Sequence, residues 1–283
     1  MPIDPAVAVG ASLGETTFSW TSSDVLLYHL ALGAGADPMS PLELRYATEQ
    51  DLQVLPAFGV IAANLRQTKP PVVSFPGVEI DLARVLHGQQ EITVHRPLPV
   101  SATVTARARI SDVFDKGKAA VIVQESTAVD SSGEALYTTR SSIFARGEGG
   151  FGGSRGPSTS VELPDRAPDF VLDTPTLPQQ ALLYRLCGDR NPLHSDPAFA
   201  SAAGFPRPIL HGLCTYGIVC KTVIDGVLEG DVSLVAGYST RFTGVVYPGE
   251  TLRTNVWQED KRLLVTTTVD DRAVLSDTVV TLC

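Results

Sequence analysis

Apolar and polar residues are arranged in two similar halves along the chain. Each half begins with a Leu-Leu-Tyr-x-Leu segment of helical spacing, at residues 24–30 in the first half and 180–186 in the second. Further apolar helices are predicted at 55–65 and 210–228. Runs that alternate in polarity or carry β-branched residues then predict strands at 91–94, 102–110, 119–128, 135–145, 232–242, 251–257, 262–269 and 273–281.

These elements follow one another in the same order in both halves. Residues 115–118 and 270–271 are typical of hairpin turns, and strands joined by short turns form an antiparallel sheet. An apolar helix laid on one face would bury such a sheet. We therefore predict an α+β fold of two tandem helix-plus-antiparallel-sheet units, related by internal duplication.

A glycine-rich segment separates the halves. Residues 147–156 contain six glycines and Pro157 follows, a composition that disfavours a helix or a central strand. We predict an N-terminal unit over 1–146, a linker over 147–178 and a C-terminal unit over 179–283. The glycines at 147, 149 and 152 also match a dinucleotide-binding fingerprint, but the residues that follow cannot begin the helix that such a site requires.

Composition narrows the classes of function. The chain has 283 residues, 43% of them hydrophobic, which is enough for a sizeable core. A net charge of −9 argues against general binding of nucleic acid or anionic membranes. No apolar run is long enough for a membrane span, and the N-terminus does not resemble a secretory signal. We therefore expect a cytoplasmic protein whose four cysteines are reduced thiols.

The segment at 184–197 carries the most informative polar residues. Asp189, Asn191 and His194 fall in a loop between two predicted helices, and Gly188 and Pro192 prevent a continuous helix. A carboxylate and an imidazole that converge can hold a water and transfer protons near neutral pH, and an amide can orient them. Asp196-Pro197 then predicts an N-cap and the start of a short helix that ends at Gly204.

Two alternatives compete with this interpretation. In the first, Asp189 and Asn191 only cap backbone amides and His194 packs nearby. In the second, His194, Asp196 and His211 bind a metal, although no HxxxH or CxxC spacing supports such a site.

The segment at 204–217 predicts an anion-binding helix start. Pro206 and Pro208 force an extended entry, and His211-Gly212 opens the long apolar helix. The unpaired backbone N–H groups at a helix start can stabilise an oxyanion, and Gly212 would let a carbonyl approach closely. Alternatively, Gly212 only permits tight helix packing. Cys214 is a candidate nucleophile at the same helix end, or simply a core residue.

Together these two segments resemble a known family. Residues 184–194 match Tyr-x-Leu-x-Gly-Asp-x-Asn-Pro-Leu-His at every specified position, and residues 208–215 read Pro-Ile-Leu-His-Gly-Leu-Cys-Thr. Both resemble the MaoC-like (R)-specific 2-enoyl-CoA hydratases, also called hydratase 2. Segments of the first half, among them LLYHLALGAG and LPAFGV, resemble the double-length members, so the likeness covers the whole chain.

The resemblance implies a double hotdog fold and a set of roles. Asp189 and His194 would hold the water that is added across the 2,3 double bond of a trans-2-enoyl-CoA, giving the (3R)-hydroxyacyl-CoA. Asn191 would support them, and the Gly212 N–H would bind the thioester oxygen. It implies no metal and no redox cofactor, because CoA is part of the substrate. Which of Asp189 and His194 acts as acid and which as base stays open.

The first half lacks the catalytic pair, since residues 33–38 read Gly-Ala-Gly-Ala-Asp-Pro. The resemblance implies that this half houses the acyl chain instead. The phosphates of CoA need cations near the cleft, and we expect Arg207, Lys116 and Lys118 to be candidates. A homodimer is the expected assembly, although the sequence itself does not fix it.

Two other functions remain possible at this point. A hotdog thioesterase would direct water at the carbonyl carbon, and a non-catalytic acyl-CoA binding subunit would need no catalytic pair. Straight fatty chains and steroid side chains both fit the resemblance as acyl groups.

Overall fold

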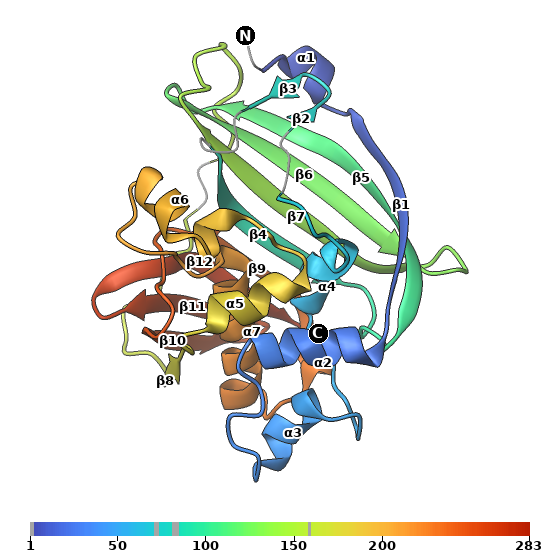
Figure 1. Cartoon of the computed structure of the whole chain (residues 1–283), viewed down its shortest axis with the longest axis vertical. Coiled ribbons are helices and arrows are strands. Elements are labelled where there is room, and N and C mark those ends of the chain that lie inside the picture. The colour runs from blue at the N-terminus through green and yellow to red at the C-terminus, as the bar shows by residue number, and fades with distance from the viewer. Residues whose placement is uncertain (1–2, 71–73, 81–84, 158–159) are drawn as a thin grey trace.

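Residues 3–70, 74–80, 85–157 and 160–283 are described by a computed structural model (Figure 1). Ten strands form one antiparallel sheet in the order β1-β5-β6-β7-β4-β9-β12-β11-β10-β8. These strands are β1 (Ser12–Trp20), β4 (Val85–Val94), β5 (Ala102–Asp115), β6 (Ala119–Val129), β7 (Ala135–Arg146), β8 (Phe170–Pro175), β9 (Val235–Phe242), β10 (Thr251–Glu259), β11 (Arg262–Val269) and β12 (Arg272–Leu282). A separate ribbon pairs β2 (Ser74–Phe75) with β3 (Val78–Glu79).

The helices are short except for α2 and α7, which have 10 and 16 residues. They are α1 (Pro5–Ala8), α2 (Ser22–Ala31), α3 (Pro41–Ala47), α4 (Phe58–Ile61), α5 (Gln180–Tyr184), α6 (Pro197–Ala202) and α7 (Gly212–Val227). Single 3-10 turns are η1 (Ala62–Asn64), η3 (Arg185–Cys187), η4 (Pro192–His194) and η5 (Val232–Leu234). Most helices and strands expected from the sequence form, and the α+β prediction is confirmed. Two differ: residues 232–234 of the expected strand over 232–242 form η5, and the helix expected over 55–65 is reduced to α4 and η1. Among the described residues, no helix has the length and apolar character needed to cross a bilayer.

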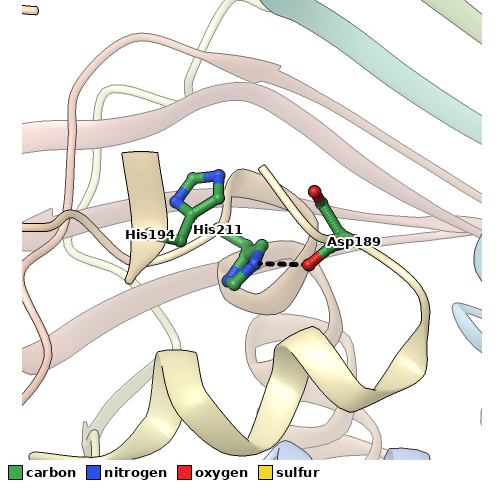
Figure 2. A group of neighbouring side chains, drawn as sticks. All are labelled: Asp189, His194 and His211. Carbon is green, nitrogen blue, oxygen red and sulfur yellow. Dashed lines mark hydrogen bonds between the residues drawn. The ribbon is translucent and has the colours of Figure 1, made fainter. Parts of the chain in front are cut away.

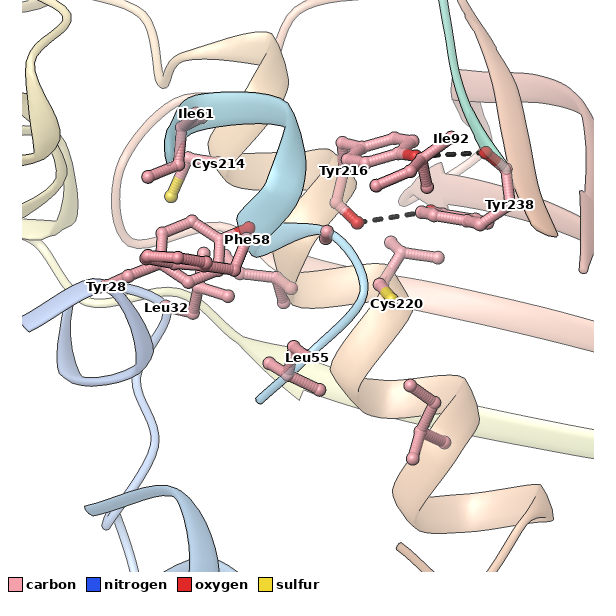
Figure 3. Close-up of a cluster of buried hydrophobic side chains, with 14 of the residues drawn as sticks. Tyr28, Leu32, Leu55, Phe58, Ile61, Ile92, Cys214, Tyr216, Cys220 and Tyr238 are labelled. Carbon is pink, nitrogen blue, oxygen red and sulfur yellow. Dashed lines mark hydrogen bonds between the residues drawn. The ribbon is translucent and has the colours of Figure 1, made fainter. Parts of the chain in front are cut away.

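Helix α7 is the central helix of the second half, and the sheet curves around it (Figure 1). The rings of Tyr216 on α7 and Tyr238 on β9 stack with centroids 4.2 Å apart. Each of the two hydroxyls donates to the backbone carbonyl oxygen of the other tyrosine, at 3.0 and 3.1 Å (Figure 3). This reciprocal pair fixes the rotation of α7 on the sheet.

The first half has a much shorter central segment, made of α4 and η1. Phe58 on α4 packs edge-on against Trp20 and Tyr28, with ring centroids 5.6 Å away in both cases. Side chains of α2, α4 and α7 meet in one buried cluster that includes Tyr28, Phe58 and Cys214 (Figure 3). The two halves therefore share this core, and the first half also buries a smaller cluster of its own around Ile110 and Ile122.

The halves also share the sheet. Strand β4 of the first half pairs with β9 of the second from Gln89↔Arg241 to Thr93↔Gly237. This pairing joins the two five-stranded units edge to edge. It places the start of α7 beside the segment that follows α4, and the candidate site lies at this junction.

The connection between the halves differs from the expected linker over 147–178. Residues 170–175 form β8, which pairs with β10, so the second unit begins before the predicted boundary. Its proline-rich surroundings concealed this strand, which lies at the sheet edge, where proline is tolerated. The glycine-rich part begins no helix; the carboxylate of Asp115 accepts hydrogen bonds from the N–H groups of Gly117, Gly150 and Gly152. The segment is thus a connection and has no dinucleotide-binding helix.

Candidate active site

The loop between α5 and α6 carries the predicted catalytic pair. It begins at Gly188, where η3 ends with a φ of 107°, in the left-handed region. A Cβ at this position would overlap the backbone carbonyl oxygen of Asn64 in the first half. Glycine therefore permits both the turn and the close approach of the two halves, and Asp189 follows directly.

Local hydrogen bonds shape this loop. The backbone N–H of Asn191 donates to Oδ1 of Asp189 at 3.0 Å, and Oδ1 of Asn191 accepts from the N–H of Leu193 at 3.1 Å. Asn191 thereby caps η4, which begins at Pro192. The capping interpretation is correct for both residues, and it is compatible with catalysis because the capped turn brings His194 near Asp189.

His194 ends η4 and is 8% exposed. Its Nδ1 lies 2.9 Å from the backbone carbonyl oxygen of Ile209. A carbonyl oxygen only accepts, so Nδ1 carries the proton and Nε2 of the neutral ring keeps its lone pair. Burial lowers the pKa of His194 below its ordinary 6.5, and the charge of Asp189 partly opposes this shift. His194 is therefore available as a neutral base near pH 7.

His211 is the third member of the group. Its ring stacks on that of His194, with centroids 3.7 Å apart, and its Nε2 lies 3.4 Å from the backbone carbonyl oxygen of Asp189 (Figure 2). Burial, together with the charge of His194, lowers the pKa of His211 well below 6.5. From the sequence, His211 was considered only as a metal ligand, because these contacts depend on the tertiary structure.

The group also contains atoms that could bind a metal. Asp189, His194 and His211 offer oxygen and nitrogen atoms within 4.8 Å of one another, and Zn²⁺ binds such ligand types. The metal site considered from the sequence used Asp196 instead. That carboxylate accepts from two backbone N–H groups of α6 and caps this helix, as predicted. Alternatively, Asp189 and His194 can hold one water and exchange its protons, with His211 packed beside them.

Gly212 begins α7 directly after His211. Its N–H has no acceptor within the helix, because the first N–H groups of an α-helix precede any carbonyl they could reach. A Cβ at this position would lie 3.2 Å from the ring of Phe242. The packing interpretation and the oxyanion interpretation therefore both fit this glycine.

A cavity of about 510 Å³ lies beside Asp189 and receives walls from both halves. The second half contributes Tyr184, Cys187, Gly188, Asp189 and Leu213, and the first half contributes Ile61, Asn64, Gln67, Lys69 and Pro70. Lys69 is the cation among these lining residues, so it could contact a phosphate group of CoA. No motif in the sequence distinguished it from other exposed lysines.

The three predicted CoA contacts lie in two separate places, Arg207 before α7 and the two lysines in the turn between β5 and β6. The guanidinium of Arg207 lies 4.8 Å from the ring centroid of Tyr247. Lys116 lines a second cavity, of about 700 Å³, between the connection and strands of both halves. Lys118 is exposed at the turn before β6. Among the residues described, none of the three lines the cavity beside Asp189.

Cys214 does not have the surroundings of a nucleophile. It is fully buried in α7, with its Sγ 3.9 Å from the backbone carbonyl oxygen of Ala31. Burial raises the pKa of its thiol well above the ordinary value, so the thiol stays protonated. The core interpretation of this cysteine is the correct one.

Known proteins are similar to this chain in both sequence and fold. Residues 18–147 match the MFE-2 hydratase 2 N-terminal domain family, and residues 159–280 match the MaoC like domain family. The chain is 58% identical to enoyl-CoA hydratase ChsH3 of Mycobacterium tuberculosis, over 98% of each protein. A crystal structure of a MaoC-like dehydratase from Phytophthora capsici matches with a TM-score of 0.86 and 27% identity, covering 99% of this chain and 98% of that one. A Mycobacterium tuberculosis protein with a double hotdog fold matches with a TM-score of 0.60 at 14% identity, covering 99% of this chain and 98% of that one, a likeness of fold alone.

Proposed function

The chain belongs to the MaoC-like hydratase 2 family, and from this membership we propose that it reversibly hydrates trans-2-enoyl-CoA to (3R)-3-hydroxyacyl-CoA. The observation that supports this proposal most directly is the convergence of Asp189 and His194 beside the first N–H groups of α7. The enzyme acts in β-oxidation, on a fatty acyl chain or a steroid side chain.

The proposed mechanism adds one water across the double bond. The carboxylate of Asp189 and Nε2 of His194 hold this water, and Asn191 keeps their loop in shape. As the water oxygen bonds to C3, one of its protons passes to the pair, and the pair delivers a proton to C2. Charge that develops on the thioester oxygen is stabilised by the N–H of Gly212 at the positive end of α7.

The configuration of the product tests this function. Incubation with crotonyl-CoA should consume the conjugated double bond without release of free thiol, and chiral chromatography of the product should find the 3R enantiomer. A fixed water attacks one face of the substrate, so one enantiomer should dominate. Mainly 3S product would contradict the proposal, and rapid thiol release would favour the thioesterase alternative.

The first half supplies the proposed acyl-chain wall. Ile61 lines the cavity beside Asp189, whereas Ala62 is buried in the core and Ala63 is exposed and outside the cavity. Ala62 and Ala63 are small residues of the same segment, but a larger side chain at either would not enter the cavity. Ile61 is therefore the better position for a substitution that narrows it.

Ile61→Phe should narrow the cavity selectively. We expect kcat/KM for a ten-carbon enoyl-CoA to fall about tenfold, the effect of one or two misplaced methylene groups, with crotonyl-CoA hardly affected. Ala63→Phe is the matched control, because it adds the same ring to the same segment outside the cavity. An equal loss on both substrates in folded Ile61→Phe would place the acyl chain elsewhere.

The remaining assignments also stay proposals. No metal and no redox cofactor is required, because the thioester itself acidifies C2. Arg207, Lys116 and Lys118 are retained as candidate CoA contacts, and Lys69 joins them because it lines the cavity beside Asp189. A homodimer in the cytoplasm, without nucleic-acid or membrane partners, is the proposed state of the protein.

A further inference from the structure

His211 contacts both members of the catalytic pair while taking no part in the proposed proton transfers. Its ring lies on the ring of His194, and its Nε2 reaches the backbone of Asp189 (Figure 2). We propose that His211 is a positioning residue that holds the Asp189 carboxylate and the His194 imidazole at one water. This inference rests on the proposed hydration and adds a role to it.

The hydrogen bond to Asp189 defines the form of the ring. The acceptor is a carbonyl oxygen, so Nε2 of His211 must carry the proton. Nδ1 is buried without a hydrogen-bond partner among the described residues. An unpaired buried nitrogen is unfavourable, and its persistence indicates that the ring orientation is imposed by its other contacts. These contacts are His194, Asp189 and the ring of Tyr184, whose centroid lies 5.0 Å away.

The backbone of His211 is equally constrained. Its carbonyl oxygen accepts from the N–H groups of Cys214 and Thr215, at 3.0 and 3.1 Å, so the residue is anchored to the first turn of α7. The N–H of Gly212 follows in the chain. His211 therefore contacts or adjoins three parts of the proposed mechanism: the loop that carries Asp189, the imidazole of His194, and the N–H of Gly212.

A neutral ring suits this position. When His194 takes a proton, a second imidazolium stacked at 3.7 Å would repel it. The charged and titratable groups near His211 among the described residues are Asp189, His194, Arg185 and Tyr184, and His211 itself is 1% exposed. A neutral His211 can thus support His194 in both of its protonation states.

Two substitutions separate the two contacts. His211→Phe keeps a flat ring against His194 and removes the N–H donor, whereas His211→Gln keeps an N–H donor and removes the ring. Each should lower kcat for crotonyl-CoA by about 10- to 100-fold, the effect of displacing reacting groups by up to about 1 Å, and should change KM by less than about threefold.

His29→Gln is the matched control. This histidine is also fully buried, but it donates to the backbone carbonyl oxygen of Tyr46 in the first half. Its loss should therefore lower the melting temperature without lowering kcat.

A double-mutant cycle distinguishes positioning from a merely structural role. If His211 acts through Asp189 and His194, then His211→Gln should have little further effect on kcat in an Asp189→Asn background. An undiminished effect in that background would overturn the inference. So would folded His211 variants that both keep kcat within about threefold of the parent enzyme.

One measurement needs no variant and stays informative if the substitutions do not fold. Long-range ¹H–¹⁵N spectra of histidine-labelled protein at neutral pH should show His211 as the neutral Nε2–H tautomer. A protonated ring or an Nδ1–H tautomer would contradict the inference. Failure of the unmodified enzyme to hydrate any enoyl-CoA would instead refute the proposed function itself, so the two failures are distinguishable.

Discussion

Asp189→Asn and His194→Ala are each expected to lower kcat for crotonyl-CoA hydration by at least about 100-fold, the low end of the usual contribution of general acid–base groups. The first substitution keeps the size of the side chain and removes its charge; the second removes the Nε2 lone pair that the Ile209 contact leaves free. KM should change much less, because other residues hold CoA. Purified variants would be assayed by loss of the enone absorbance.

The same pair should behave as a unit. Because both residues act on one water, the double variant should be little worse than the worse single variant. Circular dichroism spectra that match the unmodified protein are the required control for folding. Folded single variants that both keep more than about a tenth of the parent kcat would show that the proposed mechanism is wrong, and the thioesterase and binding-subunit alternatives would then gain weight.

Gly188→Ala should destabilise the protein by about 2–6 kcal/mol, combining backbone strain at positive φ with overpacking. Its Cβ would meet the backbone carbonyl oxygen of Asn64, which cannot rotate away as a side chain could. Any relief must move the loop or the first half, so activity should fall as well, since Asp189 is the next residue. Urea unfolding would measure the loss of stability.

Gly204→Ala is the matched control for this effect. Gly204 also has a positive φ, of 88°, but nothing lies within 4 Å of the position that a Cβ would take. It should therefore show backbone strain alone, about 1 kcal/mol at the low end of the usual range. If Gly188→Ala were no more destabilising than Gly204→Ala, the contact between this loop and the first half would not be close in solution.

Local sequence determined much of this protein. Apolar spacing located α2, α5 and α7, and Asp196-Pro197 located the start of α6, because capping and periodicity act within a few residues. The convergence of Asp189 and His194 was also predictable, since Gly188 and Pro192 break the helix between them. The resemblance to a family added the thioester substrate, which no spacing of residues could have named.

Two strands of the main sheet, β1 and β8, were missed from the sequence for one physical reason. Strands β1 and β8 are the two edges of the sheet, and each pairs with a neighbour on one side only. Most residues of β1 are exposed, so its sequence shows no alternation of apolar and polar positions. Inner strands carry that signal because one or both of their faces are buried.

Contacts between the halves were equally hidden. The contribution of Ile61 and Lys69 to the cavity beside Asp189 arises only when the two units dock. The stacking of His211 on His194 lies within the second half, but it also depends on the tertiary structure, because it joins the end of η4 to the start of α7. The candidate CoA contacts were chosen by charge and proximity in the sequence alone. Charge does not determine where a side chain lies after folding, and the structure places Arg207 and the turn that carries Lys116 and Lys118 away from the residues that line the cavity beside Asp189.

The pairing of β4 with β9 also has a consequence for solubility. Either half alone would expose one of these strands as an unpaired edge, and such edges recruit other chains and promote aggregation. A covalent connection keeps the matching edge at an effective concentration in about the millimolar range, far above that of free chains in a cell. The β4–β9 pairing, which also brings the proposed acyl-chain wall beside the proposed catalytic pair, therefore protects the newly made protein from self-association.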